Sequence, residues 1–401
     1  MLKRKFINNV KRGLGSAFIE LSNALDKEEY RESLVYCLTH DCSYDFIFEG
    51  SKGDFLYRLI DIYQDKSYFI DIVINTLFHV KGYSNLHAQL LDILMADYYT
   101  GNKVIKKIFQ DYYSYFLKNG RWTQNKIECY NYLSIQMSRL FGIRKVKSII
   151  TDWKRLNIDI SKHWFGFYVE EKYNLIEIES DDKNTEKYTY RFEEFLQLLN
   201  TKEHVYCFGS FATEEEHQKC MNYLVDSNNK DIVKKILVNY QSDYIKRKIN
   251  IEVLLSLVDK FDEDTNVEIY NTLALYKDKR VVDIAFELAE TVNYKIAIRM
   301  LMTNYKKEYK DLIVSLYKKI KFSFKSFEFL TYATATFMRN KKKNMPDEIL
   351  YITYYNDYCA FNREYIVQCM NKRRLITESI KQELKYDSDY EIRRYANRYI
   401  K

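Results

Sequence analysis

Proline and glycine are both scarce in this sequence, and the lack of each favours helices. Pro346 is the single proline among 401 residues, and all ten glycines lie at or before Gly209. Because proline lacks a backbone N–H and clashes with the preceding turn, its near absence permits long uninterrupted helices. Beyond Gly209 the chain must turn with Asn, Asp, Ser and Lys. Scarce Pro, Ala and Gly beside abundant Lys, Asn, Ile and Tyr is also typical of A/T-rich coding, so the 38 tyrosines do not by themselves predict a base-binding surface.

Long apolar runs and closely spaced cysteine pairs are missing as well. No run approaches about 18 apolar residues, the length that a membrane-spanning helix needs, and the first residues lack the continuous apolar core of a secretory signal. The seven cysteines are scattered without a CxxC pair, which disfavours both a disulfide framework and a structural zinc site. We therefore predict a cytoplasmic protein with reduced cysteines, no cofactor and no transmembrane segment.

A sustained basic stripe is also absent. The 63 Lys and Arg residues exceed the 56 Asp and Glu residues by seven, and residues 1–19 alone supply five of that surplus. A nucleic-acid groove needs a continuous basic path along the phosphate backbone. The charge therefore favours another protein as the partner and leaves nucleic acid as the alternative. Residues 371–401 carry nine basic and five acidic residues, a mild surplus that would help a partner to dock.

A repeated helical motif is the most informative feature that the sequence does contain. Residues 26–40 and 65–79 align without a gap at a spacing of 39 residues. The identical pairs are Asp26 and Asp65, Lys27 and Lys66, Leu38 and Leu77, and His40 and His79. Because one helix pair cannot bury its apolar face alone, a helical motif that recurs at this period predicts a stack of helix pairs.

Helical periodicity extends over most of the chain. Residues 2–25 have an amphipathic pattern that predicts a first, capping helix, with a basic membrane-surface helix as the alternative. Gly13 and Gly15 interrupt this pattern and mark either close packing or a break. Further helices are expected near 27–39, 53–63, 66–80, 84–99, 102–118 and 123–141. The links between them are short, which predicts antiparallel pairs.

We predict three parts along the chain. Residues 1–160 form an N-terminal helical-repeat sub-array, residues 161–212 an irregular connecting segment with a polar, acidic stretch, and residues 213–401 a C-terminal sub-array. In this last part, helical segments of about ten to twelve residues follow one another with a few polar residues between them.

An Asp followed by an aliphatic and a basic residue recurs at helix starts in the C-terminal part. The copies are Ser242-Asp243-Tyr244 before Ile245-Lys246-Arg247, the looser Asp278-Lys279-Arg280-Val281-Val282, and Ser388-Asp389-Tyr390 before Ile392-Arg393 and Ala396. This pattern resembles the HEAT and armadillo-type families. The resemblance implies an all-α fold, an α-solenoid in which HEAT-like helical hairpins form a right-handed superhelix. The Asp and Arg residues would then form a hydrogen-bond ladder between repeats, with a ligand site as the alternative.

Residues 40–58 gather polar side chains around an apolar helix end, and this segment is our candidate binding site. With Arg12 of the first helix, the candidate residues are Arg12, His40, Asp41, Tyr44, Asp45, Glu49, Ser51 and Arg58. Glycines at 50 and 53 would leave free N–H groups at the start of the next helix, where an anion is favoured. In the alternative, the segment is an ordinary loop in which Asp45 or Ser51 caps a helix and Glu49 pairs with Arg58.

The same region carries a second resemblance. It consists of an Arg-Gly-Leu-Gly stretch that is followed later by Tyr-Asp and by Glu-Gly-Ser. The residues concerned are Arg12, Gly13, Leu14, Gly15, Tyr44, Asp45, Glu49, Gly50 and Ser51. This pattern resembles the N-terminal part of uncharacterised bacterial HEAT-like proteins. The resemblance implies a fold and no chemistry.

Catalytic motifs are absent: the sequence has no P-loop, no Rossmann glycine fingerprint, no GxSxG elbow and no HExxH pair. One family of HEAT-like architecture, the alkylpurine DNA glycosylases, works with Trp, Asp and Arg in a concave groove. The chain resembles that family in the residue types of Trp122, Asp152, Trp153, Arg155 and Trp164. Tryptophans that fill gaps between helices are the simpler interpretation.

A zinc site is the best metal hypothesis, although the simpler interpretation is again a set of core residues. The equal H-x-x-C spacings are formed by His204, Cys207, His217 and Cys220. Because the cysteines lie in apolar surroundings in the sequence, we predict no metal site.

The sequence thus predicts a non-catalytic protein-interaction scaffold or adaptor that presents a concave helical surface. The alternative is a nucleic-acid-binding HEAT-like protein with chemistry like that of a DNA glycosylase. A third interpretation is an adaptor that docks on acidic membrane through residues 2–12.

Overall fold

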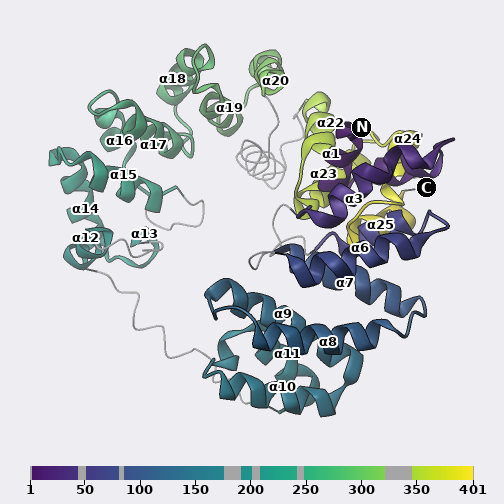
Figure 1. The fold of residues 1–401 in the computed structure, drawn as a ribbon. Coiled ribbons are helices and arrows are strands. Elements are labelled where there is room, and N and C mark those ends of the chain that lie inside the picture. The colour runs from purple at the N-terminus through teal and green to yellow at the C-terminus, as the bar shows by residue number, and fades with distance from the viewer. Residues whose placement is uncertain are drawn as a thin grey trace. The chain divides into compact units, whose positions relative to one another are not determined.

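The computed structural model describes residues 2–43, 51–80, 85–175, 191–200, 208–241, 248–320 and 346–400. Every regular element within these ranges is a helix, which confirms the all-α prediction (Figure 1). In the same ranges, no helix has both the length and the apolar composition to cross a membrane. The chain divides into two compact units: unit 1 comprises Met1–Glu179 and Thr353–Lys401, and unit 2 comprises Ser180–Ile352.

Unit 1 combines helices from both ends of the chain. Its N-terminal elements are α1 (Arg4–Arg12), α2 (Gly15–Ser22), η1 (Lys27–Tyr30), α3 (Arg31–Thr39), α5 (Gly53–Ile60), α6 (Lys66–His79), α7 (Asn85–Tyr99), α8 (Ile105–Lys118), α9 (Gln124–Phe141), α10 (Ile143–Arg155), η2 (Ile160–Lys162) and α11 (Trp164–Tyr173). The C-terminal elements are α23 (Ala360–Lys372), α24 (Glu378–Leu384) and α25 (Tyr390–Tyr399), and α22 (Asp347–Asn356) crosses the boundary between the units. Helices pack in an alternating order along the chain, α1 with α3, α3 with α6, α5 with α7, α7 with α9 and α9 with α11.

The two copies of the repeated motif form equivalent helices. Residues 26–40 fold into η1 and α3, residues 65–79 into α6, and α3 packs against α6. The repeated histidines occupy the same place: Nδ1 of His40 lies 2.9 Å from the Tyr36 carbonyl oxygen, and Nδ1 of His79 lies 2.8 Å from the Asn75 carbonyl oxygen. Each ring therefore contacts the last turn of its helix, where carbonyl groups lack intrahelical partners.

The predicted first helix is two helices, because the chain breaks at Gly13. α1 ends at Arg12 and α2 begins at Gly15. Gly13 has a φ of 70°, the left-handed conformation that ends many helices and that glycine adopts without a Cβ clash. Phe6, Val10 and Leu21 on these helices are fully buried and belong to the core of unit 1.

The C-terminal helices of unit 1 pack against its N-terminal helices. α24 contacts α2, and α25 contacts α23 and α24. In Figure 1 the yellow C-terminal helices lie beside the purple N-terminal ones. The backbone N–H of Ser388 donates to the carbonyl oxygen of Gly13 at 2.8 Å. The two ends of the chain are therefore joined directly.

Unit 2 contains short helices, four of which are capped at their starts by Asn or Asp. Its elements are α12 (Phe192–Asn200), α13 (Phe208–Phe211), α14 (Glu214–Asp226), α15 (Lys230–Asn239), α16 (Ile251–Leu257), α17 (Glu263–Leu273), α18 (Lys279–Ala289), α19 (Tyr294–Thr303), η4 (Lys307–Tyr309) and α20 (Lys310–Lys319). Asn229, Asn250, Asp262 and Asp278 accept backbone N–H groups at the starts of α15 to α18. Such caps satisfy donors that a helix leaves free. α14 contacts α16, α15 contacts α17, and α17 contacts α19, so the alternating order holds here too.

Polar side chains link α16 and α18 in unit 2. Arg280 Nη2 lies 2.8 Å from Glu252 Oε1, 28 residues earlier in the chain. Asp278 pairs with Arg280 at 2.9 Å and caps α18. Because water screens these exposed groups, each pair contributes little stability on its own.

Of the other two copies of the ladder pattern, the structure describes the one at the start of α25. Asp243 and Arg247 lie outside the described residues. Asp389 caps α25 by accepting the Ile392 N–H at 2.9 Å, and Arg393 donates to carbonyl groups just before α25. In this copy the Asp and Arg therefore fix the start of their own helix.

Candidate anion-binding site

A buried ion pair fixes the junction of the two chain ends in unit 1. Arg363 of α23 and Asp387, which follows α24, are both fully buried, and two hydrogen bonds of 3.0 and 2.8 Å join them. Arg363 Nη1 also donates to the carbonyl oxygen of Arg12 at 2.7 Å. Burial opposes the positive charge, but the Asp387 carboxylate outweighs it, so the pKa of Arg363 is raised above its ordinary value. The pair therefore holds the corner between α1 and α2 against the C-terminal helices.

Two glycines allow the backbones to approach closely at this corner. A Cβ on Gly13 would overlap the side chain of Ser388, and a Cβ on Gly15 would overlap the carbonyl oxygen of Glu383. The Glu383 carboxylate accepts the Ser16 N–H at 3.3 Å, and burial raises its pKa. The segment between α24 and α25 is thereby held against the N-terminal helices.

Carbonyl groups of this segment orient two guanidinium groups. Arg58 Nη2, from α5, donates to the Asp387 carbonyl oxygen at 3.0 Å. Arg393 Nη1, from α25, donates to the same oxygen at 2.7 Å and to the Ser388 carbonyl oxygen at 2.8 Å. Because one oxygen accepts from both arginines, two side chains from opposite ends of the sequence lie side by side.

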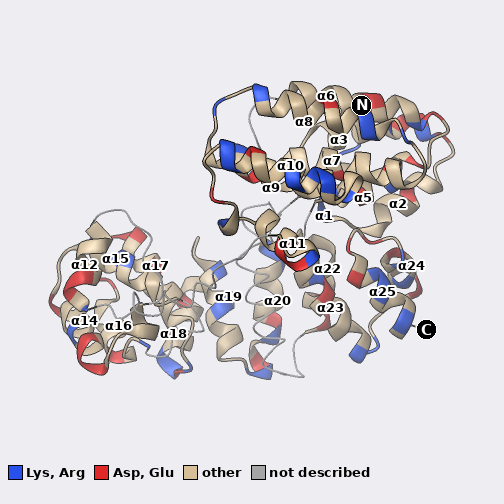
Figure 2. Cartoon of the chain, turned by 90° about the horizontal axis from the view of Figure 1, so that it is seen from below, with Lys and Arg blue, Asp and Glu red and all other residues tan. Residues whose placement is uncertain are grey.

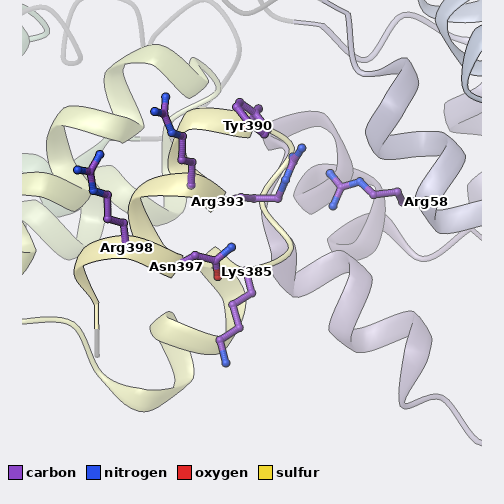
Figure 3. A pocket seen from close by; sticks show the side chains of 7 residues that line it. Arg58, Lys385, Tyr390, Arg393, Asn397 and Arg398 are labelled. Atoms are coloured by element: carbon purple, nitrogen blue, oxygen red, sulfur yellow. The ribbon is translucent and has the colours of Figure 1, made fainter.

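The two arginines line a pocket of about 530 Å³ between α5 and the C-terminal helices. The lining residues are Arg58, Lys385, Tyr390, Arg393, Arg394, Asn397 and Arg398. Five of these side chains are cationic and none is acidic. The residues of α25 follow the three- and four-residue spacing of one helix face. Figure 3 shows Arg58 opposite the side chains of α25, and Figure 2 shows basic positions on α25 beside the C-terminal end of the chain.

Nearby carboxylates offset only part of this positive charge. Burial, followed by the charge of Arg393, lowers the pKa of Arg58 to about 10, although Asp54 and Asp387 act in the opposite sense. Asp54 Oδ2 lies 3.3 Å from Arg58 Nε and 3.8 Å from Arg393 Nη2. Glu391 Oε2 lies 3.3 Å from Arg394 Nη1. The Asp387 charge is offset by its buried partner Arg363. The five pocket cations then exceed the carboxylates of Asp54 and Glu391 by three positive charges, which favours an anionic ligand.

The described members of the predicted candidate cluster each make local contacts. His40 stacks on Tyr36 with 4.0 Å between ring centroids. Asp41 accepts the backbone N–H of Ser43 at 2.9 Å. Ser51 Oγ accepts the Gly53 N–H at 3.1 Å, just before α5, whose N-cap residue is Lys52.

Two predicted residues do lie at the junction of the chain ends, and three lie outside the described residues. Arg12 places its guanidinium 5.1 Å from the centre of the Tyr358 ring. Arg58 lines the pocket. The predicted residues outside the described ranges are Tyr44, Asp45 and Glu49. The basic surplus of residues 371–401 is the sequence signal for the remaining pocket residues.

Of the residues proposed for a nucleic-acid groove, Trp153 belongs to the core of unit 1, whereas the Arg155 side chain is 66% exposed. Trp153 is fully buried, its Nε1 donates to Ser134 Oγ at 3.1 Å, and its rings stack with Tyr130 at 5.0 Å. Asp152 pairs with Arg155 at 3.0 Å. Stacking on a nucleobase needs a free aromatic face, and Trp153 presents none.

Trp122 also packs within this cluster. Its ring lies 5.4 Å from that of Tyr130, and Lys126 Nζ lies 4.1 Å from its centre. Trp122 is half-buried, so it fills a gap between helices in the way that the simpler interpretation predicts.

The described part of the zinc pattern has ordinary core contacts. His217 Nδ1 lies 2.9 Å from the hydroxyl oxygen of Tyr240, and burial raises the pKa of the Cys220 thiol to about 12. A thiol with that pKa stays protonated near neutral pH, whereas zinc binds the thiolate. His204 and Cys207 lie outside the described residues. Over the described ranges, no group of three or more His, Cys, Asp or Glu side chains is placed to hold a metal ion.

The chain was compared with known proteins at the level of families, sequences and structures. No protein-family model, curated protein or solved structure matches the chain.

Proposed function

We propose that this protein is a non-catalytic binding scaffold that holds another protein by docking an anionic segment in the pocket between α5 and α25. The single observation that supports this proposal is the cluster of five cationic side chains without an acidic residue in the lining. Electrostatic complementarity of this kind steers and orients a partner.

The scaffold that we propose is a HEAT-like α-solenoid, with helical hairpins stacked in a right-handed superhelix. The alternating contacts of α3 with α6, α5 with α7 and α7 with α9 in unit 1 support this arrangement. The same order of α14 with α16 and α15 with α17 in unit 2 supports it separately. Stacked helix pairs give extended surfaces suited to holding a protein.

The partner that we favour is a protein rather than a nucleic acid. A nucleic-acid backbone needs cationic groups along an extended path, whereas the surplus here lies in one pocket of about 530 Å³. Nucleic acid stays the second candidate because the three arginines on one face of α25 would also pair with phosphates. The free cysteines among the described residues support a reducing, cytoplasmic location.

The proposal predicts that an acidic peptide binds and that pocket arginines carry the binding. A fluorescein-labelled peptide rich in Asp and Glu should bind the full chain in fluorescence anisotropy at low salt and dissociate as salt rises. Arg58→Gln and Arg398→Gln should each weaken binding about tenfold or more, because a hydrogen bond to a charged group contributes about 1.5–3 kcal/mol. Arg398 lines the pocket and is exposed, so its loss should leave the fold intact.

The matched control is Lys162→Gln, which removes the same charge elsewhere in unit 1. Lys162 is 77% exposed and pairs with Asp159 at 3.4 Å, so this variant should bind like the unmodified protein. A 20-base-pair DNA duplex at 50 mM salt should give no gel shift. Equal losses in the pocket and control variants, or tighter binding to the duplex than to the peptide, would overturn the proposal.

A further inference from the structure

We infer that the anionic group held by the pocket is a phosphate monoester on a protein segment, and that Asp54 competes with it from within the chain. This inference rests on the proposed function and assigns the partner chemistry of the same site.

Two guanidinium groups converge on one oxygen atom in the free protein. Asp54 Oδ2 lies 3.3 Å from Arg58 Nε and 3.8 Å from Arg393 Nη2. The carbonyl groups of residues 387 and 388 already accept other N–H groups of these arginines, so both guanidinium groups are held in place. Their remaining N–H groups point to a common position, where they form a clamp.

Asp54 offsets the positive charge of this clamp but leaves hydrogen-bond donors of the two arginines unused. Arg58 Nε is buried and makes no hydrogen bond, although it lies within ion-pair distance of Asp54. The distance of 3.8 Å from Arg393 Nη2 to Asp54 Oδ2 is also too long for a hydrogen bond. The side chain of Asp54 is 64% exposed. It is therefore free to turn toward solvent when a better anion arrives.

A phosphate monoester matches the clamp better than a carboxylate does. It carries about −1.5 to −2 charges at neutral pH and three strong acceptor oxygens. The pocket offers a surplus of three positive charges, and four of its five cations are arginines. Arginine binds phosphate with two parallel N–H groups, which a lysine does not do.

The surroundings favour a phosphorylated protein segment over a nucleotide. Nucleotide phosphates commonly bind at a free helix N-terminus beside a glycine-rich loop, but the pocket lining contains no glycine. The N-terminus of α25 is closed by Asp389, whose carboxylate accepts the Ile392 N–H at 2.9 Å. Beyond the clamp, the pocket is lined by Tyr390, which is 64% exposed, and by the amide of Asn397. These two side chains would contact the residues that flank a phosphate in a protein segment.

The test compares three labelled peptides that differ at one residue, with phosphoserine, glutamate or serine flanked by alanine and glycine. In fluorescence anisotropy, the phosphoserine peptide should bind at least about tenfold more tightly than the glutamate peptide, and the serine peptide should not bind. Asp54→Asn should strengthen phosphoserine binding about five- to tenfold, because it removes the internal competitor. Arg393→Gln should abolish the preference for phosphoserine.

Asp61→Asn is the matched control, since it removes the same charge at the other end of α5. Asp61 is 55% exposed and pairs with Lys66 at 2.9 Å, away from the clamp residues, so phosphoserine binding should change less than twofold. Equal binding of the phosphoserine and glutamate peptides would overturn the phosphate assignment while leaving the scaffold proposal in place. Unchanged or weaker binding by Asp54→Asn would overturn the role of Asp54. Tighter binding of ADP or a single-stranded oligonucleotide would assign the pocket to nucleotides instead.

Discussion

Replacing Arg363 by methionine should destabilise unit 1 by about 3–5 kcal/mol, the usual cost of breaking a buried ion pair on one side. Arg363 and Asp387 are both fully buried, so the variant leaves a carboxylate without its countercharge. It also removes the donor to the Arg12 carbonyl oxygen. The C-terminal helices should therefore detach from α1 and α2 at lower denaturant than in the unmodified protein.

Tryptophan fluorescence during urea unfolding measures this change in unit 1 alone. All three tryptophans, Trp122, Trp153 and Trp164, lie within residues 1–179. With a denaturant dependence of about 1–3 kcal/mol per molar urea, the midpoint should fall by at least about 1 M.

The control for Arg363→Met removes both charges. The double variant Arg363→Met with Asp387→Leu should lose less stability than the two single variants lose in sum, with a coupling of at least about 2 kcal/mol. A loss below about 1 kcal/mol for Arg363→Met would mean that the pair does not join the chain ends in solution.

Gly15→Ala should also destabilise unit 1, although the same change at an open helix position would stabilise it. Alanine favours a helix over glycine by about 1 kcal/mol. At Gly15 the added Cβ would overlap the Glu383 carbonyl oxygen, a backbone atom that moves only with α24. Overpacking of this kind costs about 1–3 kcal/mol. The variant should unfold at lower urea and should bind the acidic peptide more weakly, because the segment between α24 and α25 orients Arg58 and Arg393.

Ser16→Ala is the neighbouring control for this substitution. It keeps the backbone N–H that donates to Glu383, and Ser16 already has a Cβ. Its stability should stay within a few tenths of a kcal/mol of the unmodified protein. A gain in stability for Gly15→Ala would contradict the close approach of α2 and α24.

Local features of the fold could be predicted because the residues that determine them lie close together in the sequence. A break at Gly13 is one of the two outcomes that the sequence predicts, and the left-handed conformation of this glycine produces it. The equivalent places of His40 and His79 follow from the repeated motif. Each of these depends on residues within one helix or at its end.

The junction of the chain ends could not be predicted in this way. Arg58 contacts the Asp387 carbonyl oxygen across 329 residues, and Ser16 contacts Glu383 across 367. Periodicity describes which face of a helix is apolar and not which distant helix covers it. The sequence therefore indicated Arg58 as a polar residue of interest and a basic C-terminal stretch, but it did not indicate that they meet.

Hydrogen exchange at the Ser388 amide tests the central claim most directly. This N–H donates to the Gly13 carbonyl oxygen at 2.8 Å, so it is slow to exchange only while the chain ends are joined. In the full chain the amide should be protected, and Arg363→Met or Gly15→Ala should remove that protection. Exchange at the rate of an unstructured peptide in the unmodified protein would contradict the joined ends and the pocket that depends on them.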